Sequence, residues 1–121
     1  MSERYSKLFS LTENLYTEGS PVIIAAGALL KDNQTGRVIA QLKLRNISSK
    51  IIKAATVSLS LMNTVGNPLG ESVRYEYLDL SSTRDTDFGS KSAIPLPDAS
   101  TRSFSVAVVE VIFTDNSSRR P

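Results

Sequence analysis

The acidic stretch Asp85-Thr86-Asp87-Phe88-Gly89 is the part of the sequence that comes closest to a chemical motif. Hard cations such as Ca²⁺ prefer several oxygen ligands at alternate positions of a loop, and Asp85 and Asp87 occupy such positions. A calcium loop of the EF-hand type also needs a third ligand before its glycine and a more distant glutamate, and both are missing. We therefore interpret the stretch as a solvated acidic loop, and we expect no bound metal and no cofactor.

Catalytic chemistry is limited by the residue types that the chain lacks. It contains no cysteine and no histidine, which excludes disulfides, thiol nucleophiles, Ser-His-Asp triads and zinc sites built on these residues. A pair of carboxylates, such as Asp85 and Asp98, could still serve a glycosidase. That reaction also needs a deep sugar cleft, commonly lined by aromatic residues, and the chain has four Phe, four Tyr and no Trp. We expect that the protein is not an enzyme.

One group of aromatic and basic residues is a candidate for an interaction surface. Tyr and Arg are favoured at interfaces because they combine a large contact area with polar ends. The alternative is that the two tyrosines lie on the core face of a strand, with their hydroxyls at the rim. The candidate surface consists of Arg74, Tyr75, Tyr77, Phe88, Lys91 and Arg102.

Length and charge indicate an ordinary domain. The 121 residues are enough for one domain with its own core, which we expect to span residues 1–121, alone or as the first domain of a longer chain. A formal charge of +2, with both signs interspersed, argues against binding to nucleic acid or to an anionic membrane. The N-terminus lacks the apolar core of a signal peptide, and the apolar run Val22–Leu30 is too short to span a membrane. The expected location is the cytoplasm, unless a further segment attaches the domain to a membrane.

The stretch from Arg37 to Asn63 contains the clearest structural pattern. Apolar residues alternate with polar ones in two runs, which is the period of a strand with one buried and one solvated face. Asn46 to Lys50 lies between the runs and supplies side chains that hydrogen-bond their own backbone in turns. We expect two strands of a half-buried antiparallel sheet, around which the other strands are organised.

Four further strands follow from similar patterns: Tyr5–Leu11, which Leu8 interrupts, Val22–Lys31, Glu71–Leu80 and Thr101–Thr114. The second is apolar or small at nearly every position, which predicts a strand covered on both faces, with a short helix as the alternative. In the last, the apolar phase changes near Val108-Val109, which indicates either two buried faces or a β-bulge. The predicted core contains Val38, Leu42, Leu44, Val57, Leu59, Leu61, Val106 and Val108.

Turns separate these strands. Asp32–Gly36 is a predicted hairpin loop with its glycine placed for a positive φ angle, and Thr64–Gly70 is a second turn. Ser81–Pro97 is the longest irregular segment, and segments of this length are commonly functional or mobile. About seven short strands with such turns predict an all-β antiparallel sandwich of the immunoglobulin-like kind, with a partly open barrel as the alternative.

The sequence resembles a known family in two places. One is the run NISSKIIKAATVSLSLMNTVGNPL, residues 46–69, and the other is VVEVIFTDNSS, residues 108–118. They resemble the small immunoglobulin-like accessory domains of bacterial envelope-associated proteins, including FxLYD-type domains, over about residues 42–117. The resemblance implies a non-catalytic association module, often attached to membrane helices or zinc ribbons, neither of which these residues contain. It implies no particular functional residue.

Two classes of function remain open. The first is a binding or scaffolding module that associates with another protein or with itself, through the loop Ser81–Pro97 or through the edge of the last strand at Val109–Phe113. The second is a sandwich that binds a small ligand or a carbohydrate. An exposed aromatic platform on one sheet would favour the second class, and a flat surface with an open, uncharged edge strand would favour the first.

Overall fold

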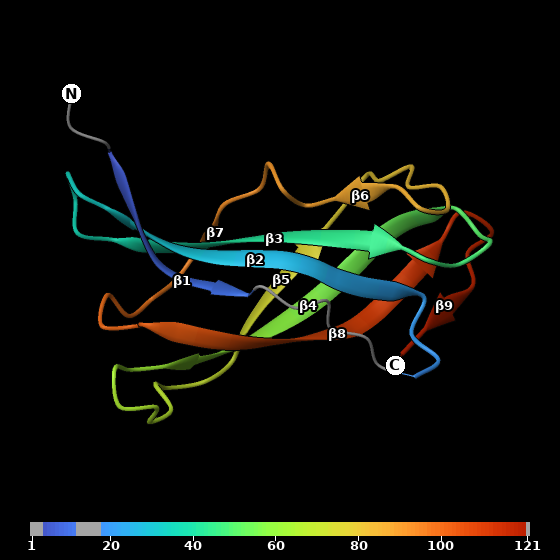
Figure 1. Ribbon diagram of the computed structural model, residues 1–121. Coiled ribbons are helices and arrows are strands. Elements are labelled where there is room, and N and C mark those ends of the chain that lie inside the picture. The colour runs from blue at the N-terminus through green and yellow to red at the C-terminus, as the bar shows by residue number, and fades with distance from the viewer. Residues whose placement is uncertain (1–3, 12–17, 121) are drawn as a thin grey trace.

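A computed structural model describes residues 4–11 and 18–120, and in it two antiparallel sheets pack face to face around one core (Figure 1). The described residues form strands and turns without a helix, which confirms the predicted all-β sandwich. The strands are β1 (Tyr5–Leu11), β2 (Val22–Asp32), β3 (Val38–Asn46), β4 (Ile52–Met62), β5 (Val73–Tyr77), β6 (Asp87–Phe88), β7 (Ile94–Pro95), β8 (Ser103–Phe113) and β9 (Ser118–Arg119).

The first sheet, called sheet A here, has the order β1-β2-β3, and both β6 and β7 pair with the far side of β3. The second, sheet B, has the order β5-β4-β8-β9. The period-two runs of β3 and β4 correspond to alternating burial, so their apolar residues point into the core. However, β3 and β4 do not share a sheet as we expected. Alternation shows which face of a strand is buried but not which strand lies beside it, and here the two buried faces meet across the core.

Of the two alternatives for the change of phase in the last strand, two buried faces or a bulge, the structure has the bulge. Thr56 of β4 pairs with Glu110 and the next residue, Val57, pairs with Val108, so Val109 is the extra residue in β8. The residue that interrupts the pattern of the first strand, Leu8, has the same explanation, since the register of β1 shifts at that point. A bulge restores the alternation after an extra residue, which explains why both apolar patterns change phase.

Six of the eight predicted core residues are buried, and the other two are only half-buried. The two exceptions are Val106 and Val108 of β8, which pack against the rim of the core. Phe104 and Val111, from the same strand, are buried instead. Val22–Lys31 is a strand, as predicted, but most of its residues are half-buried rather than covered on both faces, because no further layer formed by the described residues covers the outer face of sheet A.

The segment Ser81–Pro97 is less irregular than predicted. Its residues form β6 and β7, which pair with β3 at Leu44–Phe88 and at Ala40–Ile94 and so complete sheet A. Strands of two residues are too short to show an alternating pattern, which is why the sequence did not reveal them.

A fully buried asparagine holds this segment to the connection between the sheets. The Asn46 side-chain amide donates to the backbone oxygens of Lys50, at 2.9 Å, and of Ser82, at 2.8 Å. Its oxygen accepts from the backbone N–H of Ser48 at 2.8 Å and from the Ser48 hydroxyl at 2.7 Å. The expectation that residues 46–50 form a turn with side chain–backbone bonds is therefore confirmed.

We predict that Asn46→Ala destabilises the protein by about 3 kcal/mol, because the side-chain hydrogen bonds to the Lys50 and Ser82 oxygens and from the Ser48 amide are lost together. Asn67→Ala is the matched control, since Asn67 lies exposed in the turn after β4, and a change below about 0.5 kcal/mol is expected. Chemical denaturation of both variants measures the difference. Equal losses of stability in the two variants would show that the Asn46 hydrogen bonds contribute little.

Candidate functional site

Three of the six candidate interaction residues meet inside the sandwich rather than on its surface. The Tyr77 ring contacts Tyr75 edge to face at a centroid distance of 4.9 Å and Phe88 at 5.8 Å. Tyr77 and Phe88 are buried, and Tyr75 is half-buried against the core. These residues join the edge of sheet B, at β5, to the edge of sheet A, at β6. The alternative assignment, that the tyrosines belong to the core face beside Val73, describes them better.

The hydroxyl of Tyr77 has an unusual environment. It is buried, and within the described residues it is the only buried side-chain oxygen or nitrogen without a hydrogen-bond partner. Burial raises the pKa of this phenol above its ordinary value, with a smaller contribution from Tyr75. The neutral hydroxyl is therefore retained at all physiological pH values, and the residue acts as a large apolar side chain.

The three basic candidates do not gather around these rings. Arg74 is exposed on the opposite face of β5, and Lys91 is exposed in the connection between β6 and β7. Arg102 precedes β8, where its guanidinium donates to the backbone oxygens of Ala99 and Thr101. Tyr77 pairs with Ala55 and Ser103 with Met62, so Arg102 and Tyr77 lie at opposite ends of β4, roughly 20 Å apart. The six residues therefore do not form one continuous surface.

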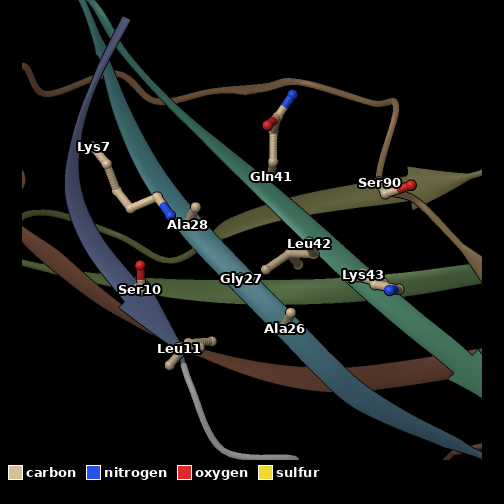
Figure 2. A pocket seen from close by; sticks show the side chains of 10 residues that line it. All are labelled: Lys7, Ser10, Leu11, Ala26, Gly27, Ala28, Gln41, Leu42, Lys43 and Ser90. Atoms are coloured by element: carbon tan, nitrogen blue, oxygen red, sulfur yellow. The ribbon is translucent and has the colours of Figure 1, made fainter.

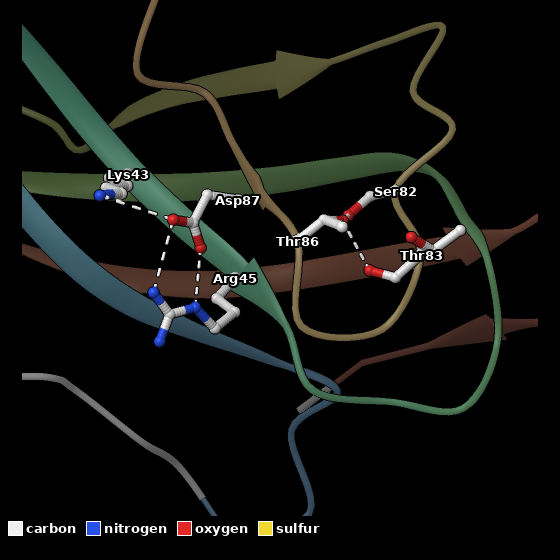
Figure 3. Close-up of polar contacts among 6 residues, drawn as sticks. All are labelled: Lys43, Arg45, Ser82, Thr83, Thr86 and Asp87. Atoms are coloured by element: carbon white, nitrogen blue, oxygen red, sulfur yellow. Dashed lines mark hydrogen bonds and ion pairs between the residues drawn. The ribbon is translucent and has the colours of Figure 1, made fainter.

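The acidic stretch forms ion pairs on the outer face of sheet A (Figure 3). Arg45 Nε lies 2.7 Å from Asp87 Oδ1, and Lys43 Nζ lies 3.5 Å from Asp87 Oδ2. The hydrogen bond from Arg45, with help from both positive charges, holds the pKa of the Asp87 carboxyl below its usual range. Elsewhere in the stretch, the Thr86 hydroxyl donates to the Thr83 backbone oxygen at 2.6 Å. Asp87 thus has cationic side chains as partners, and no group of three or more acidic side chains in the described residues could hold a metal ion.

A shallow trough of about 350 Å³ lies beside these ion pairs (Figure 2). Ala26 and Ala28 of β2 form part of its floor, and Lys7 extends from β1 toward Ala28. Gln41 and Lys43 line it from β3. The floor is low because β2 has small residues here, while its neighbours on both sides carry long side chains. The small residues of β2 are visible in the sequence, but the positions of Lys7 and Lys43 on either side of them depend on the pairing of β1, β2 and β3.

The side edges of the two sheets differ in how well they are protected. Native proteins protect free edges with charges, prolines, bulges or very short strands. β1 has Lys7 and the bulge at Leu8, and β5 has the exposed charges of Arg74 and Glu76. β6 and β7 are two residues long, and β7 contains Pro95.

The edge of β8 is different. From Ser103 to Val109 it contains no charged residue and no proline, and β4 lies on one side of it. On the other side, β9 pairs only with Val111 and Ile112, and no strand in residues 4–11 or 18–120 pairs with Ser103–Val109. The edge that we expected at Val109–Phe113 is wrong in its position, since Val111 is fully buried and β9 covers it.

Comparison with protein-family models, with curated proteins and with solved structures finds no match for this chain. The described part of the chain also contains no helix that is long and apolar enough to cross a membrane.

The packing around Tyr77 gives a sharp prediction for Gly89, which has a φ of 91°. A Cβ atom at this position would lie 3.0 Å from Tyr77 Cε1 and 3.1 Å from the backbone oxygen of Leu42. We predict that Gly89→Ala lowers the free energy of unfolding by about 3 kcal/mol. The loss has two causes, the strain of a positive φ at a residue with a Cβ atom and the close contacts of that atom with its neighbours.

Gly66→Ala is the control for this prediction, because Gly66 has a φ of 85° but nothing within 4 Å of the added atom. We expect a loss of about 1 kcal/mol there, from backbone strain alone. Thermal and chemical denaturation compare the two variants. If Gly89→Ala costs no more than Gly66→Ala, the aromatic cluster does not pack tightly against residue 89.

Proposed function

We propose that this chain is a non-catalytic module for protein association, built on an immunoglobulin-like sandwich, and that it binds its partner along the edge of β8 from Ser103 to Val109. The observation that supports this proposal is the contrast between that edge and the others: among the sheet edges of residues 4–11 and 18–120, only that of β8 has an extended stretch without a charge or a proline. Unpaired N–H and C=O groups on such an edge can hydrogen-bond to a strand of another chain, which then extends the sheet.

The strand order supports the finer description of the fold. β2, β3 and the short strands β6 and β7 lie in one sheet, while β4, β5, β8 and β9 lie in the other. The chain thus changes sheets after β3, after β5 and after β7, which is the kind of connection found in Greek-key sandwiches of the immunoglobulin type. The resemblance of residues 46–69 and 108–118 to accessory domains of bacterial envelope-associated proteins agrees with this proposal.

The distribution of aromatic residues favours protein association over carbohydrate binding. A sugar-binding platform needs aromatic rings with exposed faces, whereas Tyr77, Phe88, Phe104 and Phe113 are buried. Among the described aromatic side chains, only Tyr5 is exposed, at 39%. This leaves no group of exposed rings in the described residues.

Hydrogen exchange tests the proposal. The protein should carry an N-terminal tag, because β9 runs along β8 and a C-terminal tag could extend it. When the tagged protein is isolated from the cells in which it occurs, the amides of Ser103–Val109 that point away from β4 should exchange about tenfold more slowly than in a Ser105→Lys/Ala107→Lys variant. Both residues are exposed, so the variant should fold. β5 serves as an internal reference, because its charged edge should exchange equally fast in both proteins.

The control variant is Ser58→Lys/Ser60→Lys, which places the same charges on the same face of the central strand β4, directly opposite Ala107 and Ser105. It should retain the slow exchange of the wild type. Equally fast exchange of Ser103–Val109 in all three isolates would mean that the edge of β8 has no partner in the cell.

A second candidate function is favoured by the trough on sheet A. It contains the ammonium groups of Lys7 and Lys43, and Arg45 adds a third cation nearby, whereas Asp87, and Asp85 near Arg45, provide the negative charge. A trough with a positive balance suits a small anionic ligand, for example an acidic oligosaccharide. We rank it second because it is shallow and lacks an aromatic platform.

A titration followed by NMR separates the two candidates. A uronate oligosaccharide should shift the resonances of Ala26 and Ala28, and a Lys7→Glu/Lys43→Glu variant should weaken binding at least about tenfold, since it reverses two charges. Lys91→Glu, an exposed residue that does not line the trough, is the control. Shifts that persist unchanged in the double variant, or that a neutral oligosaccharide causes equally, would reject the trough as an anion site.

A further inference from the structure

We propose that the partner at the edge of β8 is a second copy of this chain, paired antiparallel through Ser103–Val109 so that sheet B continues from one protomer into the other. This inference rests on the proposed function, and it adds the identity of the partner. Most soluble oligomers are two-fold dimers of identical chains, in which the same surface patch meets itself. The patch must therefore be complementary to itself.

Charge is the first reason why this edge fits its own copy. Like charges directly opposite one another destabilise an antiparallel pair of strands. When a strand pairs with its own copy, a charged residue near the two-fold axis of the dimer lies close to the same charge of the copy. From Ser103 to Val109 there is no charged residue. The edge of β1 would instead bring Lys7 close to Lys7 of the copy.

The two faces of the strand are the second reason. Ser105 and Ala107 pair with Ser60 and Ser58 of β4 on the outer face of sheet B, and both are small and exposed. Val106 and Val108 lie on the inner face, where they are only half-buried. Residues opposite one another in an antiparallel pair point to the same face. A two-fold axis at residue 105 or 106 therefore places small residues opposite small ones outside, and it places Val106 opposite Phe104 or Val106 of the copy inside.

The third reason is that the structure limits the length of the pairing. β9 pairs with Val111 and Ile112, and Arg120 Nε lies 3.1 Å from Glu110 Oε2. These contacts occupy the edge of β8 beyond Val109. A copy of the chain can therefore pair only along the uncharged stretch, which fixes the axis near its centre. The half-buried Val106 and Val108 lie at that centre, and the added strand would cover them.

Light scattering on the purified chain tests the proposal. We expect the mass to rise from the monomer value of 13.2 kDa toward twice that value as the concentration increases from the micromolar to the millimolar range. The Ser105→Lys/Ala107→Lys variant should weaken dimerisation at least about tenfold, because either axis brings its lysines opposite or diagonal to those of the copy. Ser58→Lys/Ser60→Lys should dimerise as the wild type does. Circular dichroism and thermal melts confirm that each variant is folded.

A mixing experiment identifies the partner as a copy. Ser105→Glu/Ala107→Glu should also stay monomeric alone, whereas an equimolar mixture of the glutamate and lysine variants should recover the dimer, since opposite charges then face each other. A partner of any other sequence would not produce this recovery.

Three results would overturn the inference: a wild-type chain that stays monomeric at millimolar concentration, a dimer that both charged variants retain, or a mixture that does not associate. None of these results would by itself refute the proposed function. If the purified chain is monomeric but its Ser103–Val109 amides are protected in the cellular isolate, the edge binds a strand of another protein. If the Ser103–Val109 amides of the wild-type isolate exchange as fast as those of the Ser105→Lys/Ala107→Lys isolate, both proposals fail.

Discussion

The buried hydrogen bonds of Asn46 are the interaction on which the arrangement of the two sheets depends. Asn46 ends β3 at the point where the chain leaves sheet A for sheet B, and its amide reaches the backbone of Ser82, far along the chain. Its backbone adds two more bonds, since its N–H donates to the Thr86 oxygen at 3.1 Å and its oxygen accepts from the Asp85 N–H at 2.7 Å. One residue thus fixes both the crossing between the sheets and the start of the segment that forms β6 and β7.

This constraint has consequences for the surface. Once residues 82–86 are held against the end of β3, Asp87 and Phe88 lie in register with Arg45 and Leu44. Asp87 then meets the Arg45 guanidinium on the outer face, while Phe88 points inward to the Tyr77 ring. The side of the sandwich formed by β5 and β6 is therefore closed by aromatic packing. The uncharged stretch of β8 lies on the other side of sheet B, away from this aromatic packing.

The candidate interaction surface shows where inference from residue types fails. Arg74, Tyr75 and Tyr77 are close in sequence, but alternation along β5 places the arginine outside and the tyrosines toward the core. The pattern itself contained this information, because Val73, Tyr75 and Tyr77 share one phase. The trough with Lys7 and Lys43 could not have been found in the same way, since its residues come from strands whose pairing and register the sequence does not specify.

By itself, the sequence determined the class of the fold, most strand positions, the turn at Asn46–Lys50 and the change of apolar phase at Val108-Val109. These features depend on local alternation and on side chains that bond nearby backbone, so they are encoded within a few residues. Only the tertiary structure decided that β3 and β4 belong to different sheets, that Ser81–Pro97 contains two short strands, and that β9 covers the end of β8. The physical reason is that strand pairing is a contact between distant segments. The same alternating pattern is compatible with several neighbours, and the choice among them depends on the whole core and on buried groups such as Asn46.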